Sequence, residues 1–188
     1  MLRRSLLWLS EQQRLFEFVR RNGLARRFAE RFVAGETIES AAAAAEALAA
    51  RGVAATLDVL GESVHEVAAA EAACGQYLAL LDRMARSRSS GVEVNVSVKL
   101  TQMGFDLDEE LCLRNMVRIL DRARAAGGFV RLDMESSDYT QRTLDFFEHR
   151  LYPVYGQHVG VVIQSALRRS TADVERLIGL GARVRLCK

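Results

Sequence analysis

Residues 92–98 carry the clearest β-strand pattern in the chain. Four valines alternate there with polar residues, and β-branched side chains at every second position favour a strand with a packed face. Lys99 follows directly, ahead of a polar turn that contains Gly104. A lysine at a strand's carboxyl end is poorly placed for core packing. It is well placed to meet a ligand, because parallel α/β sheets bind ligands beyond these strand ends.

Helical periodicity comes first in the chain and then alternates with strand patterns. Helical segments are predicted at residues 6–20, 24–33 and 37–50. The predicted strands are residues 53–59, 92–98, 129–134, 159–163 and 183–186. The predicted helices between them are residues 63–87, 108–126, 140–150 and 171–180, the second with Asp108 as N-cap and the last ended by Gly181.

The strict alternation of strands and helices predicts parallel strands joined by right-handed crossovers. This order suits either an open doubly wound sheet or part of an eight-stranded barrel. No Gly-x-Gly-x-x-Gly follows the first predicted strand, so a dinucleotide-binding fold lacks support. A complete barrel needs about 250 residues, and this chain has 188 with five predicted strands. A barrel built by this chain would therefore be incomplete.

The composition is typical of a soluble globular domain. Hydrophobic residues make up 49% and charged residues 27%, and the net charge of +2 indicates neither nucleic acid nor an acidic tail as partner. The three histidines lack the paired spacing of a metal centre, so we predict no metal site. The cysteines form no disulfide or metal-ligand pattern, which favours a reducing compartment; they are Cys74, Cys112 and Cys187.

Residues 1–18 could be mistaken for a targeting segment, because two arginines precede the apolar run Leu6–Leu9. No small-residue cleavage site follows, and Glu11 and Glu17 interrupt the pattern. We predict a helix that docks on the domain. The alternative is a peripheral membrane contact through its aromatic-rich apolar face. No apolar run in the chain is long enough to span a bilayer.

Polar side chains gather where the predicted strands end. One polar strand end often only caps the next helix, but five in succession are harder to explain in that way. Because the carboxyl ends of parallel strands meet at one edge, we expect these residues to form a site for a ligand with anionic and hydrogen-bonding groups. In chain order they are Asp58 and Glu62, Lys99, Asp133 and Glu135, Gln164, and Arg185 and Lys188.

Six collinear segments carry a resemblance to a known family. They are Phe32–Thr37 (FVAGET), Thr56–Glu62 (TLDVLGE), Asn95–Gly104 (NVSVKLTQMG), Arg131–Glu135 (RLDME), Val161–Gln164 (VVIQ) and Arg183–Lys188 (RVRLCK). Together they resemble bacterial proline dehydrogenase. The resemblance implies a TIM-type (β/α)8 barrel that uses FAD to oxidise L-proline to 1-pyrroline-5-carboxylate and passes electrons to membrane quinone. It also implies a cytoplasmic protein, with peripheral contact to the inner face of the cell membrane as an option.

The resemblance also assigns roles to individual residues. Lys99 would pair with the substrate carboxylate, and Asp133 would fix the ammonium of Lys99. Glu62 would close over the substrate by pairing with an arginine of the family's last helix. The cofactor would be held by three residues: Gln164 near the reactive edge of the isoalloxazine, Arg185 near the flavin N5, and Lys188 near the ribityl phosphate.

The chain departs from the family in two places. Ser165–Arg168 stands where the family has aromatic residues, and the family's later strands and final helix have no counterpart. We therefore predict a helical lead-in at residues 1–51 and, at residues 52–188, the first part of the barrel, truncated after strand five. This fragment is expected to be inactive alone. The alternatives are a non-catalytic half-barrel that self-associates or binds a partner, and a Schiff-base lyase that uses Lys99 covalently.

Overall fold

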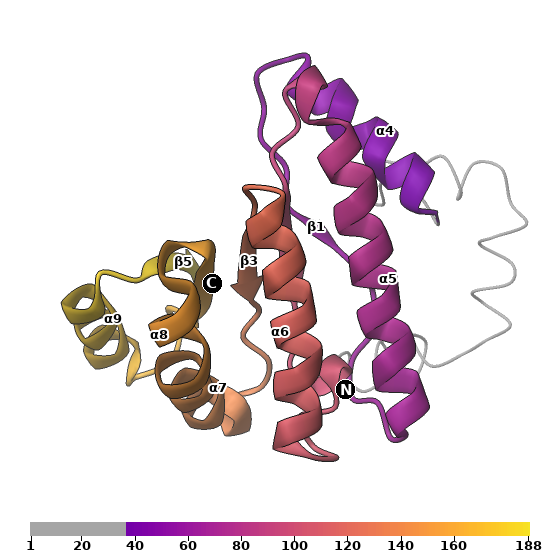
Figure 1. Ribbon diagram of the computed structural model, residues 1–188. Coiled ribbons are helices and arrows are strands. Elements are labelled where there is room, and N and C mark those ends of the chain that lie inside the picture. The colour runs from indigo at the N-terminus through magenta and orange to yellow at the C-terminus, as the bar shows by residue number, and fades with distance from the viewer. Residues whose placement is uncertain (1–36) are drawn as a thin grey trace, which may run out of the picture. The chain divides into compact units, whose positions relative to one another are not determined.

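The computed structural model describes residues 37–188, and Figure 1 shows their ribbon. Residues 45–188 form one compact unit, whose fold is described by itself below. The helices predicted at 6–20 and 24–33, and the proposed membrane contact at 1–18, lie outside the described residues. The predicted domain boundary after residue 51 stays a prediction.

Helix α4 spans Ile38–Ala49, close to the prediction. Its start is fixed by Thr37, whose Oγ1 accepts a hydrogen bond from the backbone N–H of Ser40 at 3.2 Å. A threonine at this position satisfies a donor that the first helical turn leaves without a partner.

Five parallel strands form one sheet in the order β1-β2-β3-β4-β5. Consecutive strands are neighbours throughout, whereas a doubly wound sheet reverses its strand order part-way. The order is that of a TIM-type barrel, which decides between the two architectures that the sequence left open. The strands are β1 Leu57–Asp58, β2 Asn95–Val98, β3 Phe129–Leu132, β4 Val159–Gln164 and β5 Arg183–Cys187.

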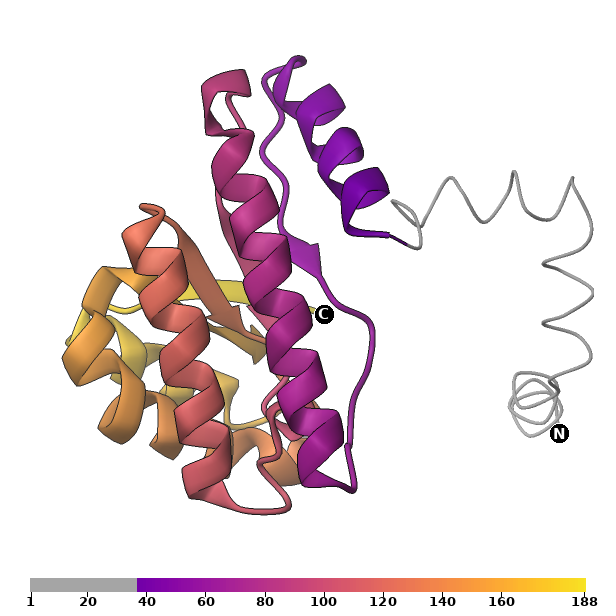
Figure 2. The ribbon, with the colours of Figure 1, turned by 45° about the vertical axis from the view of Figure 1, so that its right-hand side comes forward.

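The longer helices follow the strands as expected for a βα repeat, and α5 and α6 lie side by side in Figures 1 and 2. Asp108 is the N-cap of α6, with its carboxylate accepting from the N–H groups of Glu110 and Leu111 at 3.1 and 3.2 Å. Gly181 ends α9 at φ +69°. Both predicted caps are confirmed. The helices are α5 Val67–Arg86, α6 Glu109–Ala125, α7 Thr140–Phe146, α8 Tyr152–Tyr155 and α9 Ser170–Leu180.

One predicted helix is interrupted. A π-helical turn at Phe147–Leu151 separates α7 from α8. Pro153 lies in the first turn of α8, and it has no N–H to donate to the carbonyl of residue 149. The ladder therefore changes register just before the proline. The short 3₁₀ turns are η1 Arg88–Ser90, η2 Thr101–Met103, η3 Ser137–Tyr139 and η5 Gly156–His158.

Two predicted boundaries near the amino end of the unit are wrong. The strand predicted at 53–59 shrinks to Leu57–Asp58, because β1 pairs with β2 over two residues only and Val53 is 45% exposed. The helix predicted from Ser63 begins at Val67. Ser63 has φ +50°, which no residue of a right-handed helix adopts.

The two faces of the sheet differ in polarity because side chains alternate along each strand. One face is apolar and packs under the helices, with buried residues Leu57, Val96, Val98, Val130, Leu132, Val159, Val161 and Ile163. The other face, called the polar face below, carries Asp58, Asn95, Ser97, Lys99, Arg131, Asp133, Arg183 and Arg185. Among residues 37–188, no helix is long and apolar enough to cross a membrane.

Candidate active site

Lys99, Asp133 and Arg185 lie at one level of the sheet, at the carboxyl ends of the strands. Lys99 and Asp133 directly follow the paired residues Val98 and Leu132, and the N–H of Asp133 donates to the carbonyl of Val98 at 2.9 Å. Leu132 pairs with Val161, so Asp133 lies level with Val162 on β4. Val162 pairs in turn with Arg185 on β5. The strand-end residues identified in the sequence are therefore brought to one edge of the sheet.

The ion pairs at this edge differ from those that the sequence analysis expected. Nη2 of Arg185 lies 2.5 Å from Oδ1 of Asp133, and Nζ of Lys99 lies 3.3 Å from Oε2 of Glu62. Asp133 thus binds the guanidinium two strands away and does not fix Lys99. All three side chains share one level of the polar face, so register alone does not choose between the partners. The loop after β1 carries Glu62 over Lys99, and Lys99 pairs with that carboxylate.

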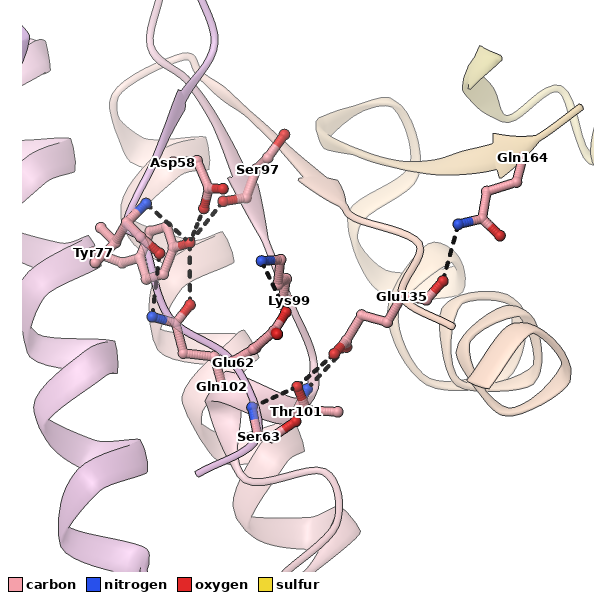
Figure 3. Close-up of polar contacts among 11 residues, drawn as sticks. Asp58, Glu62, Ser63, Tyr77, Ser97, Lys99, Thr101, Gln102, Glu135 and Gln164 are labelled. Atoms are coloured by element: carbon pink, nitrogen blue, oxygen red, sulfur yellow. Dashed lines mark hydrogen bonds and ion pairs between the residues drawn. The ribbon is translucent and has the colours of Figure 1, made fainter. Parts of the chain in front are cut away.

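Gln164 and Lys188 lie at the same edge, further toward the carboxyl ends. The side-chain amide of Gln164 donates to the backbone carbonyl of Glu135 at 3.0 Å, as Figure 3 shows. Lys188 follows β5 and is exposed, and its backbone carbonyl accepts from the N–H of Ala166 at 3.4 Å. The bond to Glu135 fixes the side chain of Gln164 through its amide nitrogen and does not use its side-chain oxygen Oε1.

Arg131 lies one level below Asp133 on the polar face. Its guanidinium stacks on the ring of Phe129 at 5.0 Å and donates to Thr56 at 3.3 Å, while its buried Nε has no partner. Burial lowers the pKa of Arg131, and the nearby charges of Arg185 and Arg183 lower it further. The polar face therefore has a surplus of positive charge around this residue.

Asp58, at the end of β1, is held by a buried tyrosine. The hydroxyl of Tyr77, from helix α5, lies 2.8 Å from Oδ1 of Asp58 and 2.8 Å from the carbonyl of Ser97. Loss of solvent around the carboxylate raises the pKa of Asp58, and the Tyr77 hydrogen bond and the charge of Lys99 offset part of that rise. Burial and the Asp58 charge raise the pKa of Tyr77 well above its ordinary value, so Tyr77 acts as a neutral donor.

A family model for proline dehydrogenase matches residues 41–186. The chain belongs to the proline dehydrogenase family. Among curated relatives, it is 35% identical to the proline dehydrogenase of Deinococcus radiodurans over 99% of this chain and 59% of that protein. It is 34% identical to proline dehydrogenase 1 of Bacillus subtilis over 100% of this chain and 60% of that protein. The chain thus spans about 60% of the length of these relatives.

A solved structure of the family supports the fold. Proline utilization A from Bdellovibrio bacteriovorus, crystallised after inactivation by N-propargylglycine, superposes with a TM-score of 0.74 at 25% identity. The match covers 87% of this chain and 20% of that one. The TIM-type class expected from the family resemblance is therefore confirmed.

The structure adds residues to the candidate site that sequence reasoning missed. Tyr77 was hidden in the apolar stripe of a predicted helix, and only its buried position beside Asp58 identifies it. Thr101 and Gln102 follow Lys99 in the turn η2 and are buried at 1% and 3% exposure. Their polarity in a buried turn was the available signal, because buried polar side chains are normally hydrogen-bonded.

A separate pocket of about 380 Å³ lies at the opposite edge, near the amino ends of the strands. Two of its polar side chains have partners: Arg88 donates to the carbonyl of Ala126, and Nδ1 of His158 lies 3.0 Å from the carbonyl of Gly128. The buried Oδ1 of Asn95, which also lines the pocket, has none. In α/β barrels this edge serves stability rather than chemistry. Within residues 37–188, no group of three or more His, Cys, Asp or Glu side chains is arranged to hold a metal ion.

Proposed function

We propose that this chain carries part of the active site of an enzyme that oxidises L-proline to 1-pyrroline-5-carboxylate. The observation that carries the proposal is the placement of Lys99, Asp133 and Arg185 at one level of a sheet in a chain of the proline dehydrogenase family. Cations fixed at this edge suit a substrate with a carboxylate group.

FAD is the cofactor that the family suggests, and the donor set fits it. The polar face carries four cationic side chains against two carboxylates, and one buried guanidinium nitrogen, Nε of Arg131, has no partner. Fixed cationic donors stabilise a group that takes on negative charge. When bound, the flavin supplies the hydride acceptor, which amino-acid side chains lack. Gln164, Arg185 and Lys188 are the residues proposed to hold it.

The side chains of the chain itself bind and orient. Lys99, with 24% of its side chain exposed, would present its ammonium to the substrate carboxylate. Glu62, 67% exposed in its side chain, would give up Lys99 to the substrate and close over it. Asp133 would keep the Arg185 guanidinium at one position, so that its charge faces the site before the substrate arrives.

The acceptor and the location follow from the family alone. We propose that electrons pass to a membrane quinone and that the protein works in the cytoplasm, with peripheral contact to the inner face of the cell membrane as an option. Residues 1–18, for which that contact is the alternative to docking on the domain, lie outside the described residues.

We also propose that turnover requires the part of the relatives' chains that lies beyond the match to residues 1–188. Within the described residues, β5 pairs with β4 on one side, and Val184 and Leu186 on β5 are 36% and 63% exposed. Parallel strands are normally covered on both faces. The alternative is a non-catalytic half-barrel that buries these side chains by self-association. A Schiff-base lyase has less support, because Lys99 is paired with Glu62 and does not lie in an apolar pocket.

A comparison of two proteins tests the proposal. One is residues 1–188, and the other is the same chain continued by the carboxyl-terminal part of the Deinococcus radiodurans relative. With added FAD, the continued chain is expected to be yellow and to reduce a quinone analogue when L-proline is present, whereas residues 1–188 remain colourless and inactive. Absence of flavin binding and of turnover in both would contradict the enzyme and favour the half-barrel, whose self-association light scattering would detect.

A further inference from the structure

Residues 59–66, called the β1–α5 loop below, carry Glu62. The backbone beside Glu62, at Ser63, has an unfavourable conformation. Gly61 has φ +151° and Ser63 has φ +50°, so two of three consecutive residues lie at positive φ. A serine in this region costs free energy and keeps the conformation only where its surroundings impose it. The contacts of Ser63 therefore identify what holds Glu62 over Lys99.

The contact of Ser63 is a hydrogen bond to Thr101. The backbone N–H of Ser63 donates to Oγ1 of Thr101 at 3.0 Å. Thr101 is 1% exposed and lies two residues after Lys99, at the start of the turn η2. Lys99 at the end of β2 is thus followed two residues later by the hydroxyl that binds the β1–α5 loop.

Glu135 fixes the Thr101 hydroxyl in the orientation that this contact needs. One carboxylate oxygen of Glu135 accepts from the N–H of Thr101 at 3.2 Å, and the other accepts from its hydroxyl at 2.5 Å. The single hydroxyl proton of threonine then points to Glu135, which leaves a lone pair for the N–H of Ser63. The same residue receives the side chain of Gln164 at its backbone carbonyl, at 3.0 Å.

Figure 3 shows the resulting chain of contacts across the strand ends, from Gln164 through Glu135 and Thr101 to Ser63. It joins the end of β4, the segment after β3, the turn after β2 and the β1–α5 loop. A hydrogen bond to a charged group is roughly twice as strong as one between neutral groups. Glu135 lies at the centre of this chain of contacts, and among the described residues it forms no hydrogen bond or ion pair with Lys99 or Glu62.

We propose that Glu135 is a positioning residue that acts through Thr101. It holds Ser63 in its strained conformation, and thereby keeps Glu62 in contact with Lys99. The proposal rests on the proposed function for the importance of Lys99 and Glu62, but its test does not depend on turnover.

Hydrogen exchange in the full chain tests the link from Thr101 to the loop. Thr101→Val removes the hydroxyl at nearly constant shape, and Thr101→Ser keeps it as the matched control. In the valine variant, the Ser63 amide is expected to exchange about tenfold faster, because its N–H loses the Thr101 hydroxyl as hydrogen-bond acceptor. The serine variant should retain protection. The Val59 amide, held by Tyr77 at 3.3 Å, should keep its rate in both, whereas a general loss of stability would speed both amides.

The reactivity of Lys99 tests the link from the loop to the ion pair. Glu62→Gln removes the partner of Lys99, so an amine-acylating reagent should label Lys99 faster than in the wild type. Thr101→Val should raise this rate to the same extent, and adding it to Glu62→Gln should raise it no further. Thr101→Ser should label like the wild type.

Glu135→Gln gives the same test without changing Thr101, should the valine variant fail to fold. It is expected to speed exchange at Ser63 and labelling of Lys99 in the same direction. Unchanged exchange at Ser63 in every folded variant, or labelling of Lys99 that responds to Glu62→Gln alone, would overturn the proposal. Failure of the proposed function would show instead as absent proline oxidation with these two readouts intact.

Discussion

The guanidinium of Arg185 reaches across strand β4 to lie 2.5 Å from the carboxylate of Asp133. The two residues are 52 positions apart in the chain, and Val162 lies between them at the same level of the sheet. The pair ties β3 to β5 on the polar face. It also places one negative charge next to the positive charges that Arg131 and Arg183 bring to the same face.

The Arg185–Asp133 pair should contribute a measurable coupling energy. A double-mutant cycle with Asp133→Ala and Arg185→Ala is expected to give about 1 kcal/mol in urea unfolding, because the pair is partly exposed. The two side chains are 23% and 41% exposed. A control cycle on Arg124 and Asp121, which are 47% and 52% exposed, should give a smaller value. Equal coupling energies in both cycles would contradict the prediction that the less exposed Arg185–Asp133 pair stabilises the fold more.

Lys99 should matter for the substrate and not for the flavin. In the continued chain, Lys99→Ala is expected to lower kcat/KM by an amount equivalent to about 2–5 kcal/mol, as for other truncated charge pairs. The visible spectrum should show flavin retained. Lys99→Arg keeps the charge and serves as the control, with a smaller loss. Flavin lost together with an unchanged KM for proline would show that the role of Lys99 is misassigned.

Asp58 should make the unfolding free energy depend on pH. Burial raises its pKa above the ordinary value of 3.8, so the folded state binds the proton more tightly than the unfolded state. The loss of unfolding free energy caused by the buried carboxylate is absent below pH 3.8. It grows as the pH rises toward and through the folded-state pKa of Asp58, and is complete above it. Asp58→Asn should therefore gain stability relative to the wild type at neutral pH and lose that gain in acid. Chemical unfolding at several pH values measures this difference, and a difference that does not vary with pH would contradict it.

Gly61 should tolerate no side chain. A Cβ at this position would lie 2.6 Å from Nε2 of Gln102, at a φ of +151°. Gly61→Ala is expected to lower the free energy of unfolding by about 1–3 kcal/mol. At Gly75, within helix α5, an added Cβ would meet no atom within 4 Å. Gly75→Ala should therefore raise the free energy of unfolding by about 0.5–1 kcal/mol. Thermal unfolding of both variants checks the opposite signs.

The sequence by itself determined the succession of elements. Period-2 and period-3.6 burial are local properties of a segment, so the patterns at 92–98 and 159–163 identified strands, and Asp108 and Gly181 marked helix ends. It also identified which strand ends are polar, because the alternation of faces is fixed by the backbone.

Only the tertiary structure decided which polar groups meet. The pairing of Asp133 with Arg185 and of Glu62 with Lys99 depends on the register of segments that lie far apart in the chain. The positive φ of Ser63 and the burial of the Tyr77 hydroxyl beside Asp58 likewise result from packing between segments. Sequence patterns report whether a residue is buried, whereas a hydrogen-bond partner is set by distances of a few ångströms across strands, which no local periodicity encodes.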